Sequence, residues 1–150
     1  MNPNHLLLSP VLIAGLISWG LGQVVKVLLD RLQKHAWDWS LLFSAGGMPS
    51  THSALMGSVT LAIGIYDGFN STLFALAFAL SMVVMYDATG IRRQAGMHAQ
   101  KINLMINELF RGQPISEDQL KEVLGHSPLQ VLMGMLLGGA ITLIMWAIFH

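Results

Sequence analysis

Long apolar stretches constrain this chain more than any other feature. A helix needs roughly 20 mostly apolar residues to cross the hydrocarbon core of a bilayer. Four segments meet or approach this length, at about residues 6–29, 50–66, 71–86 and 128–149. Only 11% of the residues are charged, whereas soluble domains average about 25%. The sequence therefore predicts an all-α integral membrane bundle of about four transmembrane helices, formed by a single domain over residues 1–150.

The basic residues predict how the bundle is oriented. Three of them, Lys26, Arg31 and Lys34, lie at or just after the end of the first segment, and the other five lie between residues 92 and 121. With four spans, all eight fall on one side of the membrane, and the positive-inside rule makes that side cytoplasmic. We expect a multi-pass protein of the bacterial cytoplasmic membrane, with both termini and the tight turn "DGFNS" (67–71) outside.

The segment between the third and fourth apolar stretches has a different pattern. Apolar residues recur at helical spacing over 102–110, which indicates one amphipathic helix. The sequence "SEDQ" (116–119) has the form of a capping box and indicates the start of a second. We predict two amphipathic helices at the membrane interface over residues 92–125. A solvated loop is the alternative.

Polar motifs gather at the predicted cytoplasmic ends of the spans. They are "GGMPSTHSAL" (46–55), "MYDATGIRRQAG" (85–96) and "GHSPLQVLMG" (125–134), and Lys26 lies at the end of the first span. Polar groups at membrane depth are costly and usually mark a functional site. The convergence therefore predicts a site at the cytoplasmic face.

The chemistry of these motifs suits an anion. Helix N-termini carry free N–H groups and the positive end of the helix dipole, and two spans begin here. Pro49 and Pro128 suit a first helical turn, which needs no N–H from them. Gly46 and Gly47 allow the backbone to approach a phosphate closely, and arginine offers forked donors to its oxygens.

Each residue also has a plain structural interpretation. A histidine near a helix start is commonly a cap or an interfacial residue. In this interpretation Arg92 and Arg93 are topology determinants with no further role. Asp87 is then simply a salt-bridge partner of one of them. Gly134 and Gly138, four residues apart, are typical of close helix packing. The convergence of the motifs, and no single residue, favours a functional site.

Two of these motifs resemble those of a known superfamily. "PSTHS" (49–53) resembles the second signature, usually PSGH, of the type 2 phosphatidic acid phosphatase and vanadium haloperoxidase superfamily. "HSPLQVLMG" (126–134) is similar to the second half of the third signature, H-x-x-x-D-V-x-x-G. Together with "MYDATGIRRQAG", they look like the divergent branch of that superfamily, a set of small membrane proteins. The resemblance covers about residues 23–138.

The resemblance implies a helical bundle with a phosphohistidine mechanism that needs no metal or other cofactor. His126 matches the nucleophile that takes the phosphoryl group. His52 matches the general acid that protonates the leaving alkoxide and then activates water. An arginine would stabilise charge on the transferring group. The expected phosphate-binding residues are Lys26, Gly47, Ser50, Arg92 and Arg93.

The sequence departs from the superfamily pattern in three places. Gln130 stands where an aspartate usually follows the nucleophile, and at i, i+4 its side chain can still reach His126. Its amide oxygen can fix the tautomer without adding charge, so Asp87 is expected to supply that charge. The arginines precede His126 by more than 30 residues, as if residues 92–125 were an insertion. The first signature, K-x6-R-P, is matched only at Lys26.

Two functions remain open on this evidence. The first is a lipid-phosphate phosphatase acting on a phosphomonoester, with phosphatidylglycerophosphate as first choice and phosphatidic acid or polyprenyl phosphates next. The second is a non-catalytic protein that binds or translocates a lipid phosphate, for which a homodimer could provide a lipid path. In both cases the expected partners are the bilayer and a phospholipid, and no nucleic acid.

Overall fold

The structure is a computed structural model that describes residues 9–43, 46–109 and 125–149. Within these ranges every regular element is helical and no strand is present. The elements are α1 (Pro10–Lys34), the 3₁₀ helix η2 (Trp39–Phe43), α2 (Thr51–Asp67), α3 (Thr72–Thr89), α4 (Ile91–Leu109) and α5 (Pro128–Phe149).

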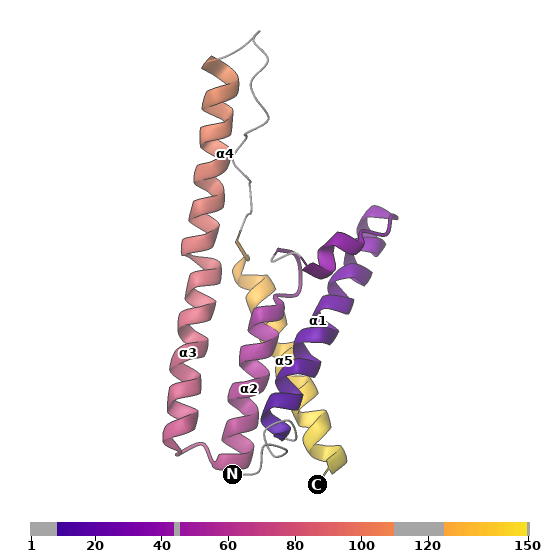
Figure 1. Ribbon diagram of the computed structural model, residues 1–150, viewed down its shortest axis with the longest axis vertical. Helices are drawn as coiled ribbons and strands as arrows, with labels where there is room; N and C mark the ends of the chain where they lie inside the picture. The colour runs from indigo at the N-terminus through magenta and orange to yellow at the C-terminus, as the bar shows by residue number, and fades with distance from the viewer. Residues whose placement is uncertain (1–8, 44–45, 110–124, 150) are drawn as a thin grey trace.

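The prediction of an all-α membrane bundle is confirmed. The helices α1, α2 and α3 run antiparallel in turn, α5 runs antiparallel to α3, and α2 packs against α1, α3 and α5 (Figure 1). In the described part of the chain, three helices are long and apolar enough to cross a membrane: α1, the combined helix Thr72–Ile106, and α5. The predicted second span, α2, has 17 residues, or about 25 Å of helix. It is shorter than the other three.

The first helix is longer than its apolar pattern predicted. We expected it to end near residue 29, but α1 continues to Lys34 and ends at His35, which adopts a left-handed conformation with φ 56°. The polar residues of the extension fit a helix because they pair along it: Lys34 Nζ lies 2.7 Å from Asp30 Oδ1, at i, i+4. Lys26 therefore lies inside the helix and not at its end.

The predicted turn between the second and third apolar stretches is confirmed. Gly68 ends α2 with φ 94°, a conformation that glycine adopts without steric cost. Ser71 then caps α3, its side chain accepting a hydrogen bond of 3.1 Å from Phe74 N. The short connection makes α2 and α3 antiparallel neighbours.

Small residues bring α2 and α5 into close contact. A Cβ atom at Gly134 would overlap the carbonyl oxygen of Ser50, and one at Gly138 would overlap that of Ala54. Further along the same interface, the hydroxyls of Ser58 and Thr142 are 2.7 Å apart. Without a hydrophobic driving force between helices in lipid, such close packing and hydrogen bonding hold a bundle together.

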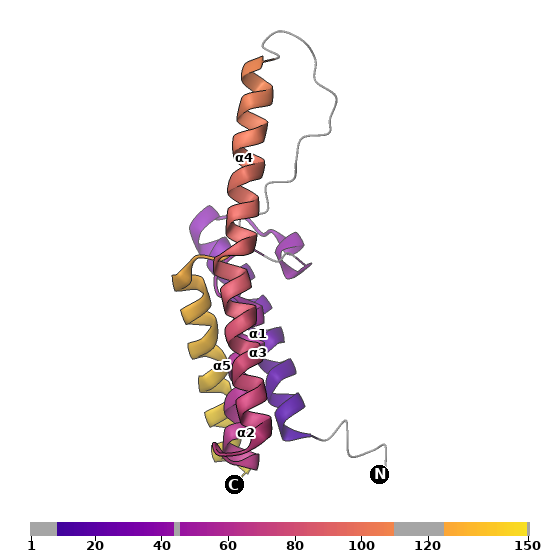
Figure 2. The same cartoon turned by 90° about the vertical axis from the view of Figure 1, so that its left-hand side faces the viewer.

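The amphipathic helix predicted after the third span is confirmed as α4, but its direction is unexpected. It continues the line of α3 beyond the end of the bundle, with only a break at Gly90 between them (Figures 1 and 2). It therefore leaves the bundle instead of crossing its end. The second predicted amphipathic helix, from residue 116, lies outside the described residues.

Candidate functional site

The candidate site lies at the end of the bundle where α1 and α3 end and where α2 and α5 begin (Figure 1). A backbone hydrogen bond of 3.0 Å joins Ser50 N to the carbonyl oxygen of Gln130. Gly134, one turn further along α5, leaves the room for this approach. The "PSTHS" and "HSPLQ" motifs, about 75 residues apart in the sequence, are therefore fixed side by side.

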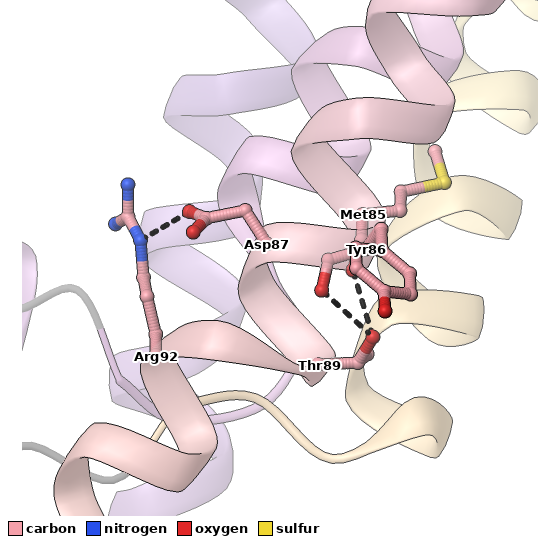
Figure 3. A network of polar contacts seen from close by, with 5 residues as sticks. All are labelled: Met85, Tyr86, Asp87, Thr89 and Arg92. Atoms are coloured by element: carbon pink, nitrogen blue, oxygen red, sulfur yellow. Dashed lines mark hydrogen bonds and ion pairs between the residues drawn. The ribbon is translucent and has the colours of Figure 1, made fainter.

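The end of α3 holds His126 in place. The last carbonyl groups of a helix have no partner within it, and Ala88 O accepts a hydrogen bond of 3.0 Å from His126 N. Other carbonyls of this turn are satisfied locally. The hydroxyl of Thr89 donates to Met85 O at 2.9 Å and to Tyr86 O at 3.5 Å (Figure 3).

Gly125 allows the two segments to touch. A Cβ atom there would overlap the backbone at Arg92 and Arg93, so only a residue without a side chain fits. The chain therefore returns from the predicted insertion to the point where it left, next to the α3–α4 junction. This contact brings His126 close to the arginines despite the long stretch of sequence between them.

A capping box at the start of α5 orients the imidazole of His126. Ser127 Oγ accepts from Gln130 N at 3.3 Å, and Gln130 Oε1 accepts from Ser127 N at 2.9 Å, the reciprocal pair of a capping box. His126 Nδ1 lies 3.3 Å from the same Oε1 atom. Because the backbone N–H requires an oxygen at this position, Nδ1 of the neutral ring must be the donor. The sequence S-x-x-Q at 127–130 signals this box, and our sequence interpretation missed it.

The other ring nitrogen of His126 makes no hydrogen bond within the described part of the chain. The residue is only 5% exposed, and its Nε2 atom is buried without a hydrogen-bond partner among the described residues. With the proton on Nδ1, Nε2 carries a free lone pair. A buried polar atom without a partner calls for an explanation.

The surroundings of His126 favour its neutral form. Burial is the largest cause that lowers the pKa of His126 below its usual value, and the hydrogen bond that Nδ1 donates to Gln130 opposes it. Positive charge on His52, Lys26 and Arg92 lowers the pKa further. These effects favour the neutral imidazole, which is the form able to act as a nucleophile.

Two of the predicted phosphate-binding residues lie against each other. Lys26 is almost fully buried, at 2% exposure, and a Cβ atom at Gly47 would lie 3.1 Å from its side-chain Cδ. Gly47 adopts φ 92°, which favours glycine. The backbone at Gly47 thus packs closely against the aliphatic part of the Lys26 side chain. The connection between α1 and α2 therefore lies next to the cationic group.

The contacts of Ser50 are structural. Its side chain is the N-cap of α2, accepting from Ser53 N at 3.3 Å and from Ser53 Oγ at 2.9 Å. His52 follows in the first turn of α2 and is half-buried. A role of Ser50 in phosphate binding remains a prediction, whereas its role as helix cap is observed.

Asp87 contacts an arginine and not the histidine. Arg92 Nε donates to Asp87 Oδ2 at 2.6 Å across the α3–α4 junction (Figure 3). The side chain of His126 instead bonds Gln130. Arg93 is exposed. The carboxylate of Asp87 thus orients Arg92. Asp87 is the salt-bridge partner of an arginine, which is the structural interpretation that the sequence left open.

Comparisons with known proteins give the same relationship as the motifs. The chain matches a family model described as the divergent PAP2 family over residues 7–141. It is similar to the uncharacterized membrane protein YuiD of Bacillus subtilis (strain 168), with 34% identity over 152 residues that cover 94% of this chain and 96% of YuiD. No solved structure matches it at a significant level.

Proposed function

Because the chain belongs to the divergent PAP2 family, we propose that it is a multi-pass membrane lipid-phosphate phosphatase that forms a phosphohistidine at His126. One observation carries the proposal. The Nε2 atom of His126 is buried and unpartnered among the described residues, while Nδ1 is held by Gln130. A tautomer locked in this way is what a nucleophilic histidine requires.

The proposed reaction has two steps. In the first, His126 Nε2 attacks phosphorus in line, the P–N bond forms, and the bond from phosphorus to the lipid alcohol oxygen breaks. His52 gives its proton to the departing oxygen. In the second, His52 takes a proton from water, the resulting hydroxide attacks phosphorus, and the P–N bond breaks to release phosphate and free imidazole. Nδ1–H remains bonded to Gln130 throughout.

The phosphoryl oxygens are held by groups that are preorganised around His126. Lys26 contributes a buried cation, and Gly47 with the first turn of α2 contributes backbone N–H groups. Arg92, oriented by Asp87, stabilises charge on the transferring group, with Arg93 as the alternative. No metal takes part in these steps, as the superfamily mechanism implies.

We assign the site to the cytoplasmic face of a bacterial inner membrane. The ends of α1 and α3 and the starts of α2 and α5 lie together, while Pro10, Gly68 and Phe149 lie at the opposite end of the bundle (Figure 1). The basic residues within the described ranges belong to α1 and α4, which end at or leave the bundle at the site end. A cytoplasmic site favours lipids made in the inner leaflet, and phosphatidylglycerophosphate is our first choice.

The orientation is tested by cysteine accessibility. The chain has no native cysteine, so single cysteines can be introduced without background. We expect positions 35 and 115 to react with a membrane-impermeant maleimide only from the cytoplasmic side, and position 69 only from outside. Labelling of position 69 from the cytoplasm would mean that the bundle has the opposite orientation and that the site does not face the cytoplasm.

A non-catalytic protein that binds or translocates a lipid phosphate is the second candidate. Gln130 is the observation that favours it, because an amide stabilises an imidazolium less than a carboxylate does. Such a protein could work as a homodimer. Phosphate release by the detergent-solubilised chain from phosphatidylglycerophosphate, phosphatidic acid and polyprenyl phosphates distinguishes the two. Release that vanadate inhibits and EDTA does not affect supports the phosphatase.

Losing the amide of Gln130 should slow the reaction by misorienting His126. Gln130→Leu leaves Nδ1–H without its acceptor, and an unpaired buried donor costs about 1–3 kcal/mol, or roughly 5- to 150-fold in kcat/KM. Ser127→Ala is the matched control, because it removes half of the capping box but keeps the backbone N–H and Gln130 Oε1 in place. Equal rates in the two variants would show that Gln130 serves only the helix.

A carboxylate at position 130 should move the pH profile. Gln130→Glu keeps the reach but adds a negative charge beside His126, which raises the pKa of the imidazole. Only the neutral ring attacks, and its fraction falls as pH drops through that pKa. The acidic limb of kcat/KM against pH should therefore shift to higher pH than in the natural protein. An unmoved limb would mean that His126 is not the group that titrates.

A further inference from the structure

A groove on the lipid-facing side of the bundle has no role in the steps above. It is a cavity of about 210 Å³, lined by residues of α2, of the turn that follows it, of α3 and by Met135 of α5. A single water needs only about 10–15 Å³, so the space admits a chain of linked groups. Two of its lining residues, Phe78 and Met82, are exposed. The groove is therefore open to the surrounding lipid.

The two hydroxyl groups in the lining are already engaged with the protein. Thr60 Oγ1 and Ser81 Oγ are 2.6 Å apart. Each also lies near a helix carbonyl, with Thr60 Oγ1 3.3 Å from Ala77 O and Ser81 Oγ 3.4 Å from Met56 O. One hydroxyl donates to the other and the second donates to its carbonyl, so neither proton is left for a ligand. The other lining side chains are apolar, and the groove suits a hydrocarbon.

The groove begins a short way below the candidate site. Its lining residues nearest the site are Met85, Gly57 and Met135. They lie about 6–11 Å along α3, α2 and α5 from the helix ends that meet at the site. Met85 is one turn before Ala88, whose carbonyl oxygen accepts the hydrogen bond from His126 N. The groove therefore continues from the neighbourhood of His126 towards the interior of the bilayer.

We propose that this groove holds the acyl chain of the lipid whose phosphate binds at His126. The groove extends to Phe69, in the turn at the opposite end of the bundle, which is the direction that a lipid chain takes from a polar face into the bilayer. The gap between groove and site leaves room for a polar spacer between phosphate and chain. The inference rests on the proposed function for the place of the phosphate, and it assigns the substrate class as glycerol-based phosphomonoesters with long chains.

The head group, and not the chain, selects this occupant. Every lipid around the bundle offers hydrocarbon, so apolar contact alone favours none of them. Once a phosphate is bound at the site, however, the chain of the same molecule reaches the groove at a high effective concentration. The groove should therefore hold the chain of a bound phosphomonoester in preference to the chains of bulk lipid.

Photo-cross-linking tests which lipid fills the groove. The probes are phosphatidylglycerophosphate and phosphatidylglycerol with a diazirine on the same acyl chain, so that they differ only by the terminal phosphate. Each is added to the full chain in phosphatidylcholine nanodiscs, with His126→Ala present so that the monoester is not consumed. We expect the monoester to label the groove residues at least about five-fold more than phosphatidylglycerol does, because its head group is held. Mass spectrometry of the peptides locates the label.

Two methionines of α5 provide matched variants. Met133 and Met135 are each 39% exposed, but of the two only Met135 lines the groove. Met135→Trp places a larger side chain in the groove and should lower labelling by the monoester to the level of phosphatidylglycerol. Met133→Trp makes the same change outside the groove and should leave the preference unchanged.

Three outcomes would overturn the acyl-chain site. Equal labelling by the two probes would mean that bulk lipid fills the groove, and no labelling by either would mean that another occupant, such as a second copy of the chain, covers it. An equal loss in Met133→Trp would place the label elsewhere. Phosphate release by protein with His126 intact is measured separately. Preferential labelling without release would remove the phosphatase and leave the acyl-chain site, and release without preferential labelling would do the reverse.

Discussion

Replacing His126 with alanine is expected to abolish phosphate release, with a loss of at least about 10³-fold in kcat, because the covalent intermediate cannot form. The residue supplies the buried Nε2 atom, which has no hydrogen-bond partner among the described residues. Release of inorganic phosphate from lipid monoesters measures the effect. Purified natural protein should form a phosphoenzyme that survives a quench in base but is lost in acid, as expected of a P–N bond. The variant should form none.

Another histidine provides the matched control. His98 is exposed on α4, which leaves the bundle beyond the site (Figure 2), so His98→Ala should retain the natural rate. His52→Ala should slow both the formation and the breakdown of the phosphoenzyme, because the same imidazole serves both steps. Release from His126→Ala at the rate of the natural protein would exclude the phosphohistidine mechanism.

The largest expected effect on stability comes from a single methyl group on α5. In Gly138→Ala the added Cβ would overlap the carbonyl oxygen of Ala54 on α2. Backbone cannot move aside as a flexible side chain does, so α2 and α5 must separate along their contact. Overpacking of this kind costs about 1–3 kcal/mol or more, which exceeds the gain of roughly 1 kcal/mol that alanine brings to a helix over glycine.

The neighbouring glycine separates packing from helix propensity. At Gly139 an added Cβ would meet only Leu61 Cδ2, at 3.8 Å, an ordinary contact. Gly139→Ala should therefore keep or slightly raise the thermal midpoint in detergent, while Gly138→Ala should lower it clearly. The midpoint is read from thermal unfolding of the purified chain. Equal midpoints in the two variants would contradict the close α2–α5 contact.

Much of the fold was predictable from the sequence, because the signals are local. The run of apolar residues from Pro128 to Phe149 predicts α5 at its observed bounds, since a helix in lipid needs only its own backbone and an apolar surface. The turn at 67–71 follows from its glycine. The end of α1 was predicted too early. The boundary was based on the run of apolar residues, whereas the last turns of the helix are polar and remain helical.

The resemblance located the candidate site, but not the contacts within it. It paired His126 with Gln130 because residues four apart share a helix face, and the two are in contact. The same reasoning expected Asp87 to supply charge to this pair, whereas its carboxylate binds Arg92. Both interpretations of Asp87 fit the sequence, since the choice depends on how the α3–α4 junction turns at Gly90.

Hydrophobicity, capping and charge act over a few neighbouring residues, so the helical segments, their polar ends and the residue types that gather there can be predicted from the sequence alone. Which helix ends touch depends on how the helices pack together. The bond from His126 N to Ala88 O forms because a helix end leaves a carbonyl free and Gly125 lets a distant segment reach it. Such contacts depend on the arrangement of several helices at once, and no single stretch of sequence encodes them.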